Sequence, residues 1–190
     1  MLEQPILLAS HNAGKLAELQ QLFAQYSISL QGYTSQLAPI PFGLEGGDYW
    51  QNATSKAAQV AVLTSLPVLG DDSGIDLAAF PNEFGVYTGR TLARQAVAAN
   101  TYLLARLRDN PQRQITLHSY LVLQIGHRLV RAHGSLTAQV ALQEQGQLSG
   151  GFDRLVYIPE LGATLAELPA LQRAHYSQRG RAVAALMQQI

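Results

Sequence analysis

The first third of the chain alternates between apolar runs and helical patterns. Residues 5–10 form a short, continuous apolar run that predicts a buried strand. Apolar residues then recur with helical spacing at positions 16, 19, 22 and 23, and Asn12 is a suitable N-cap for this helix. Residues 27–30 can form a second strand, so we expect a strand–helix–strand unit at the start of the chain.

The middle of the chain predicts a loop, two further helices and a strand that leads into acidic residues. Residues 38–48 hold two prolines and three glycines, which is typical of an irregular loop. A helix is predicted from about residue 50 to residue 65. The apolar strand that follows it, residues 67–70, runs directly into the sequence D-D-S-G at 71–74. A long amphipathic helix is expected at about 91–108.

A hairpin pattern begins the second half. Residues 115–125 are rich in Leu, Val, Thr and Tyr, and Gly126-His127 separates them from a second apolar segment at 128–133. Glycine at the first central position is typical of a type II′ turn. Strand-like sequence continues to residue 142.

The end of the chain completes an alternating pattern. After a turn-rich region that reaches residue 151, we expect a strand at 152–158 and a closing helix at 181–190. Helices that alternate with strands, together with one antiparallel hairpin, predict an α/β fold with a mixed sheet.

The composition narrows the function classes. A chain of 190 residues is long enough for one domain with its own core, and we expect a single domain over residues 1–190. The 13 basic side chains balance the 13 acidic ones, which argues against a nucleic-acid partner. The absence of cysteine excludes thiol catalysis and thiolate zinc sites. No apolar run is long enough for a bilayer and the start does not resemble a signal peptide, so we expect a soluble, cytoplasmic protein with no membrane partner.

Lysine is rare in this chain. Of the 13 basic residues, 11 are arginine, and the two lysines are Lys15 and Lys56. A chain that has no other lysine is expected to keep these two for a purpose. The alternative is that they are ordinary surface residues.

A candidate anion site lies between the first strand and the first helix. Free N–H groups and the positive end of the helix dipole make such a turn suitable for phosphate. Gly14 allows a close approach of the backbone, Lys15 adds a mobile charge, and Ser10 and Asn12 add polar groups. The segment is not a Walker A loop, because the first glycine and the Ser or Thr after the lysine are missing. An ordinary capped helix is the alternative.

The D-D-S-G segment is the second candidate. It follows a predicted strand, and open α/β sheets bind ligands at the carboxyl ends of their strands. The adjacent carboxylates of Asp71 and Asp72 repel one another unless a cation or a proton relieves them. Mg²⁺ would do so, and a carboxylate without a metal could activate water. The alternative is an acidic turn that caps the next segment.

Other chemistries have no support in the sequence. The five histidines show no metal-ligand spacing, and no G-x-S-x-G elbow of a serine hydrolase is present.

Taken in order, these pieces resemble the inosine triphosphate pyrophosphatase family, which hydrolyses non-standard purine nucleoside triphosphates to monophosphate and pyrophosphate. The similarity is colinear from the first strand to the last helix. The family's T-G-N-x-G-K-x-x-E, E-N-A-x-x-K-A, L-P-x-x-x-D-D-S-G, G-V-Y-S-A-R, F-G-Y-D-P and S-H-R-G are similar, in that order, to the segments at 10–18, 51–57, 66–74, 85–90, 150–154 and 177–180. Both lysines fall on positions of these motifs.

The resemblance implies a role for each matched residue. It implies that Asp72 activates the attacking water. Asp71, Asp72 and Gln51 are implied to surround a Mg²⁺ ion. The implied substrate-binding residues, around the triphosphate and the base, are Ser10, Asn12, Lys15, Lys56, Ser73, Phe152, Asp153, Gln178 and Arg179.

Three positions depart from the family pattern. The helix glutamate that holds metal in the family is Gln51, which removes one negative charge. The aromatic residue that stacks on the purine is replaced by Gly150, so Phe152 or Trp50 would have to substitute for it. The histidine of S-H-R is Gln178, which can both donate and accept. Because the departures affect the base pocket and one metal ligand, they predict retained pyrophosphate chemistry with an altered choice of substrate.

The resemblance also implies an elongated mixed sheet with flanking helices, two lobes with a central nucleotide cleft, and a homodimer. Two other functions stay open. One is a catalytically impaired relative that binds nucleotide or a protein partner. The other is a Maf-like nucleotide pyrophosphatase, which the D-D-S-G and S-x-R-G segments fit less well.

Overall fold

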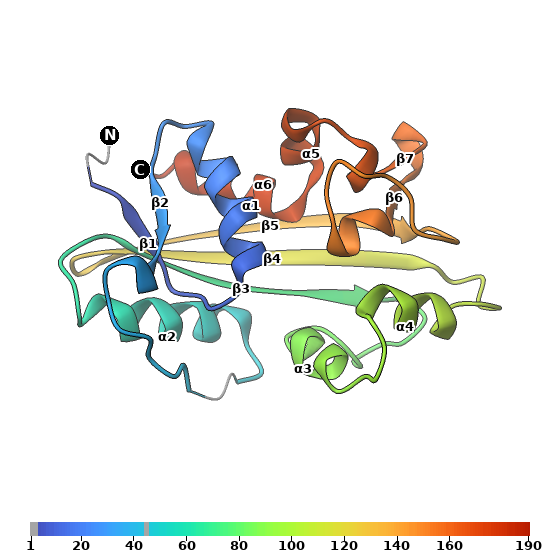
Figure 1. Ribbon diagram of the computed structural model, residues 1–190, viewed down its shortest axis with the longest axis horizontal. Coiled ribbons are helices and arrows are strands. Elements are labelled where there is room, and N and C mark those ends of the chain that lie inside the picture. Colours follow the sequence, from blue (N-terminus) through green and yellow to red (C-terminus); the bar gives the residue numbers. More distant parts are fainter. Residues whose placement is uncertain (1–3, 44–45) are drawn as a thin grey trace. The chain divides into compact units, whose positions relative to one another are not determined.

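The computed structural model describes residues 4–43 and 46–190 (Figure 1). Its strands are β1 Ile6–Leu8, β2 Leu30–Gly32, β3 Val68–Leu77, β4 Gln114–Ile125, β5 Arg128–Val140, β6 Val156–Ile158 and β7 Ala163–Thr164. Its α-helices are α1 Ala13–Ala24, α2 Tyr49–Ala61, α3 Thr88–Ala93, α4 Ala99–Arg106, α5 Ala170–Tyr176 and α6 Gln178–Met187. The 3₁₀ turns are η1 Tyr33–Ser35, η2 Gly151–Arg154, η3 Pro159–Leu161 and η4 Leu165–Glu167. None of the helices in these described ranges has the length and apolarity that a bilayer crossing requires.

The strands form one mixed sheet in the order β2-β1-β3-β4-β5-β6-β7. β1 pairs in parallel with β2 and β3, whereas β6 pairs antiparallel with β5 and β7. The predicted mixed α/β class is therefore confirmed.

The chain divides into two compact units. The first unit consists of Met1–Ser73, Ser119–Gly134 and Arg179–Ile190, and the second of Gly74–His118 and Ser135–Gln178. Each unit is assembled from segments that are far apart in the sequence. The nucleotide cleft expected between two lobes stays a prediction.

In the first unit, helices cover both faces of the parallel strands. β1 is completely buried, because its successive side chains alternate between the two faces. On one face, Leu7 packs with Val60 of α2 around the buried ring of Tyr33. α1 and α6 lie on the opposite side of the strands from α2 (Figure 1).

Gly70 allows α2 to lie directly on β3. A Cβ atom at this position would stand 1.9 Å from the carbonyl oxygen of Ala53, so no other residue fits without a backbone shift. The close approach brings the α2 residues Asn52 and Lys56, which lie four positions apart on one helical face, against the strand. The glycine thus positions the polar residues described below.

The second unit has its own apolar core. Inward-facing residues of β3, β4 and β5 pack with Phe84 and with Leu103 of α4. Arg113 connects the end of α4 to the end of β5, because its guanidinium donates to the backbone oxygens of Leu107, Val140 and Ala141.

Several of the expected elements differ from the structure. The D-D-S-G segment does not follow a strand but lies within β3, which continues to Leu77 and pairs with β4. The helix expected to end near residue 65 ends at Ala61. The helix expected at 91–108 is two short helices, and the Gln95 side chain binds the Thr91 carbonyl oxygen where the first one ends.

Other expectations are confirmed or shifted. The hairpin turns at Gly126, whose φ of +56° suits the first position of a type II′ turn. The expected second strand begins at Leu30 rather than residue 27, because Ser27 has a φ of +58° that interrupts extended backbone. The strand expected at 152–158 is a 3₁₀ turn followed by β6, and the last helix begins at Gln178.

Candidate active site

The loop before α1 offers unoccupied N–H groups. Asn12 is the N-cap, as predicted, and its Oδ1 accepts from the backbone N of Lys15 at 3.0 Å. The Ser10 Oγ accepts from the backbone N of Asn12 at 3.1 Å. The backbone N–H groups of His11, Ala13 and Gly14 have no acceptor within residues 4–43 and 46–190. Three free donors at the positive end of a helix can receive an anion.

Asp71 is bound from the α1 side of β3. The Lys15 Nζ lies 2.5 Å from Asp71 Oδ2, and the hydroxyl of Ser119 on β4 donates to Asp71 Oδ1 at 3.3 Å. The Asp71 side chain is fully buried. Burial raises the pKa of Asp71, but the charges of Lys15 and then Arg179 oppose it and hold the pKa below its ordinary value. This carboxylate is therefore ionised and forms an ion pair with Lys15.

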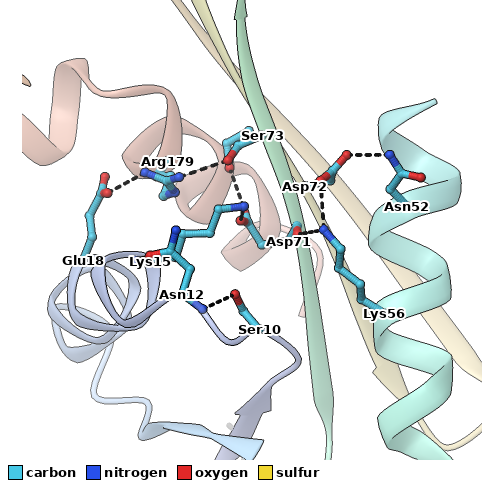
Figure 2. A network of polar contacts seen from close by, with 11 residues as sticks. Ser10, Asn12, Lys15, Glu18, Asn52, Lys56, Asp71, Asp72, Ser73 and Arg179 are labelled. Atoms are coloured by element: carbon cyan, nitrogen blue, oxygen red, sulfur yellow. Dashed lines mark hydrogen bonds and ion pairs between the residues drawn. The ribbon is translucent and has the colours of Figure 1, made fainter. Parts of the chain in front are cut away.

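Arg179 links α6 to the same face of β3. Its Nη1 donates to Glu18 Oε2 of α1 at 2.6 Å, and its Nη2 donates to Ser73 Oγ at 3.0 Å (Figure 2). Ser73 lies two positions after Asp71, so the two side chains share one face of the strand. Arg179 therefore joins the first and last helices of the first unit to the acidic strand.

Asp72 is bound from the α2 side. Its Oδ1 lies 2.9 Å from Lys56 Nζ, and its Oδ2 accepts from Asn52 Nδ2 at 2.9 Å (Figure 2). Lys56 also donates to the backbone oxygen of Asp71 at 3.3 Å. Asn52 is fixed in turn by Gly46, whose N–H donates to Asn52 Oδ1 and whose carbonyl oxygen accepts from Nδ2. The Asp72 carboxylate is thus held by two side chains, and 5% of its side-chain surface is exposed.

These contacts bring both lysines to the acidic strand and correct one expectation. Lys15, Lys56, Asp71 and Asp72 come together, although the lysines are 41 positions apart in the chain. The carboxylates, however, do not need a metal ion to relieve their repulsion. Because they are successive residues of a strand, they point to opposite faces, and each meets its own lysine.

Three polar residues of the site were missed by the sequence analysis. Asn52 stands four positions before Lys56, so the helical spacing of the two could have identified it. No local signal connects Ser119 or Glu18 to the acidic strand, because both approach it from elements that are distant in the sequence.

Gln51 lies in the first turn of α2. Its backbone N donates to the N-cap Asp48, and its side chain is exposed, with Oε1 3.9 Å from the position of a Cβ at Gly46. Over the described residues, no hydrogen bond joins this side chain to either aspartate.

The donor chemistry fits a shared magnesium ion. The part of the chain that the structure describes holds no group of three His, Asp or Glu side chains in a metal-binding arrangement. The Asp72 carboxylate and the Gln51 amide offer oxygen ligands, and Mg²⁺ commonly uses one or two carboxylates together with substrate phosphates. Such a set suits an ion bound with a triphosphate better than an ion held by protein alone.

The residues expected around the base belong mainly to the second unit. Phe152 packs against that unit's core, and Asp153 of η2 accepts from the Ser149 hydroxyl at 2.6 Å and lies 3.8 Å from Arg173 Nε. Gln178 is 7% exposed, and its Oε1 has no hydrogen-bond donor among the described residues. Their approach to the phosphate residues of the first unit stays a prediction.

Trp50 packs within the first unit. Its ring meets Tyr120 edge-on at 4.8 Å between centroids, and the Arg131 guanidinium lies over the indole ring. Tyr120 is itself stacked on Tyr49 at 4.7 Å. Trp50 is therefore already engaged in an aromatic cluster, which makes Phe152 the better candidate for a base contact.

This chain is similar over nearly its whole length to a known protein family. The chain matches the Ham1 family over residues 6–189. It is 35% identical over 187 residues to the dITP/XTP pyrophosphatase of Thermus thermophilus, covering 96% of this chain and 90% of that protein. It is 33% identical over 189 residues to the dihydroneopterin triphosphate diphosphatase of Limosilactobacillus reuteri, covering 97% and 96%.

A solved structure agrees with these matches. A HAM1 protein from Coxiella burnetii is similar with a TM-score of 0.78 at 30% identity, covering 99% of this chain and 98% of that chain. The resemblance found in the motifs is therefore confirmed, and the Maf-like alternative gains no support. The colinear motifs, the mixed sheet and the matches over nearly the whole length agree that the chain belongs to the Ham1 family.

Proposed function

We propose that this protein hydrolyses nucleoside triphosphates, non-standard purine nucleotides among them, to the monophosphate and pyrophosphate. The observation that carries the proposal is the convergence of Lys15 and Lys56 on the acidic strand, next to a loop with free N–H groups. The names of the relatives from Thermus thermophilus and Limosilactobacillus reuteri, both of which act on triphosphates, support the same reaction class.

The triphosphate would bind at the loop before α1. The free N–H groups of His11, Ala13 and Gly14 would donate to phosphate oxygens, and the Lys15 ammonium would balance part of their charge. Ser10 and Asn12 keep the loop in this conformation through their hydrogen bonds to backbone N–H groups. Asp71 contributes by holding Lys15 in place, because its buried carboxylate pairs with that ammonium.

Asp72 is the residue that we propose to activate water. A general base needs an oxygen that can accept the proton of water, and Asp72 offers a carboxylate that pairs with the Lys56 ammonium at 2.9 Å. Asn52 fixes the orientation of the carboxylate, so its remaining lone pairs face a constant direction. A water held by Asp72 would attack the α-phosphorus, and pyrophosphate would leave.

Mg²⁺ is the proposed cofactor. Asp72 and Gln51 would hold it together with the phosphates. Asp71 could join them only if Lys15 released its carboxylate. When bound, the ion would neutralise charge on the triphosphate and on the leaving pyrophosphate.

The proposed substrate has two candidates, which differ in the base. Phe152, Asp153, Gln178 and Arg179 are proposed to surround it, and Gly150 removes the stacking aromatic residue of the family pattern. The relative from Limosilactobacillus reuteri is named for a pterin triphosphate rather than a purine nucleotide. A pterin triphosphate is therefore the second candidate substrate.

The proposal is tested by pyrophosphate release. Purified protein with Mg²⁺ is offered dITP, XTP, the standard nucleotides and dihydroneopterin triphosphate, and an Asp72→Asn variant serves as the catalytic control. We expect pyrophosphate from at least one substrate and a loss of about 10²–10⁴-fold in the variant. Asp76→Asn, on the same strand but more than half exposed, should leave the rate unchanged.

The alternative is a protein that binds nucleotide without turnover. It predicts saturable binding of these triphosphates with no pyrophosphate release, and equal binding in the Asp72→Asn variant. A homodimer and a cytoplasmic location are also proposed, on the family resemblance, and size-exclusion chromatography with light scattering tests the first.

A further inference from the structure

His11 is built into the candidate phosphate loop, yet the proposed function gives its side chain no role. It lies between Ser10 and Asn12, and its backbone N–H is one of the three free donors. His11 stands where the family motif quoted above has glycine, which has no side chain.

One end of the imidazole is fixed by buried residues. His11 Nε2 lies 2.5 Å from the hydroxyl oxygen of Tyr33, a residue that has no exposed surface. The ring also packs on Phe42, with 4.9 Å between centroids and a tilt of 41°. Phe42 meets Tyr33 edge-on at 5.6 Å, so the three rings form one packed cluster. The imidazole of an exposed loop residue is therefore held in a single orientation.

The Tyr33 hydroxyl is itself anchored. It accepts from the backbone N–H of Ile40 at 3.0 Å, and the Ile40 carbonyl oxygen lies 3.3 Å away as an acceptor. Its single proton can go to His11 Nε2 or to Ile40. The hydroxyl can thus pair with Nε2 in either state: it donates when Nε2 is unprotonated, and it accepts when Nε2 carries a proton.

The other ring nitrogen has no such partner. No residue that the structure describes makes a hydrogen bond to His11 Nδ1. Nδ1 is bonded to the ring carbon that joins the imidazole to the main chain, so it is the ring nitrogen nearer to the backbone of the loop. When Tyr33 donates to Nε2, the neutral ring carries its proton on Nδ1, which makes this nitrogen a donor that faces no protein acceptor.

We propose that His11 is a further triphosphate-binding residue, whose Nδ1–H donates to a phosphate oxygen, and that Tyr33 is the positioning residue that orients it. This proposal rests on the proposed function, because it concerns the same loop. It predicts that His11 strengthens binding of the phosphate chain without taking part in the attack on phosphorus.

Inorganic tripolyphosphate with Mg²⁺ is the probe, because it has the phosphate chain and no base. Its dissociation constant is measured by calorimetry for the wild type, His11→Ala, His11→Gln and Tyr33→Phe. His127→Ala, which removes another exposed histidine at the β4–β5 turn, is the matched control. We expect about tenfold weaker binding for His11→Ala, because a hydrogen bond to a charged group is lost. His11→Gln should recover part of the affinity, and His127→Ala should match the wild type.

The kinetic counterpart separates binding from catalysis. His11→Ala should raise the KM of a triphosphate substrate by a similar factor with kcat changed less than twofold, and inhibition by nucleoside monophosphate should not change. His11→Ala combined with Tyr33→Phe should bind no more weakly than His11→Ala alone, because the hydroxyl acts through the imidazole.

The two proposals fail in different ways. Equal tripolyphosphate binding by the wild type and His11→Ala, or no binding by either, overturns the role of His11. Absence of turnover with every substrate overturns the proposed function, whereas the calorimetric difference would still support the binding role of His11.

Discussion

The carboxylates of Asp71 and Asp72 are neighbours in the chain but lie on opposite faces of β3. Asp71 pairs with Lys15 of α1 at 2.5 Å, and Asp72 pairs with Lys56 of α2 at 2.9 Å. The alternation of a β-strand produces this separation without any special geometry. The strand therefore carries one acid that holds the lysine proposed to bind phosphate and a second that is proposed to act as the base.

Replacing Gly70 by alanine should disrupt the Asp72 side of the site. The added Cβ would lie 1.9 Å from the Ala53 carbonyl oxygen, so α2 must move away from β3. We expect a loss of at least about 3 kcal/mol in the free energy of unfolding, measured by urea denaturation. Gly89→Ala is the control, since a Cβ there meets no atom within 4 Å, and it should change stability by less than about 1 kcal/mol. A Gly70→Ala protein as stable as the wild type would contradict this account of the packing.

The Lys15–Asp71 pair predicts a specific pH dependence of stability. The pKa of Asp71 in the folded protein lies below its unfolded value of about 3.9. Its ionised form therefore adds stability above that pH, and the contribution disappears as the pH falls through the folded-state pKa. The wild type should keep this contribution down to about pH 4.

Lys15→Met removes the largest favourable charge and leaves the effect of burial, which raises the pKa of Asp71. We expect a loss of about 3 kcal/mol at pH 7 that shrinks as the pH falls, because protonation of Asp71 removes the buried charge that Lys15 no longer balances. Urea denaturation between pH 3 and pH 7 measures both, with Arg108→Met as a control for losing an exposed cation. Identical pH profiles of the wild type and Lys15→Met would exclude this coupling.

Parts of this site could be read from the sequence because the signals are local. The N-cap at Asn12, the helical face of Lys56 and the acidic pair all come from patterns of fewer than ten residues. The long-range contacts could not be read in this way. Ser119 reaches Asp71 from β4, and Arg179 reaches Ser73 from α6, so both contacts depend on the three-dimensional arrangement of distant elements.

The misplacement of the D-D-S-G segment has the same origin. Two aspartates and a glycine are unfavourable in a strand, so local propensity ends the strand at Gly70. In the folded chain, Lys15 and Lys56 neutralise the two carboxylates, and pairing with the neighbouring strand extends β3 to Leu77. Tertiary ion pairs thus override the propensity of the segment.

Gln51→Glu should strengthen the response to magnesium. The substitution adds a negative charge at an exposed position of the first turn of α2, where a carboxylate also suits the helix dipole. We expect the Mg²⁺ concentration for half-maximal pyrophosphate release to fall about three- to tenfold. Ser55→Glu, one turn further along α2, adds the same charge elsewhere and should have little effect. An unchanged Mg²⁺ requirement in Gln51→Glu would exclude position 51 as a ligand.

Gln178 predicts a change of substrate preference on substitution. Its side chain is buried, and its Oε1 is an acceptor without a donor among the described residues, which costs free energy unless a ligand supplies an N–H group. A base with a ring N–H or an amino group at this edge would supply one. Gln178→His exchanges the amide for a ring that presents one donor and one acceptor in a different geometry. We expect the ratio of kcat/KM for dITP to that for dihydroneopterin triphosphate to change at least about fivefold, because a buried polar group that loses its partner costs about 1 kcal/mol or more. The tripolyphosphate affinity should stay constant, since that probe carries no base, and a constant substrate ratio would place Gln178 outside the base pocket.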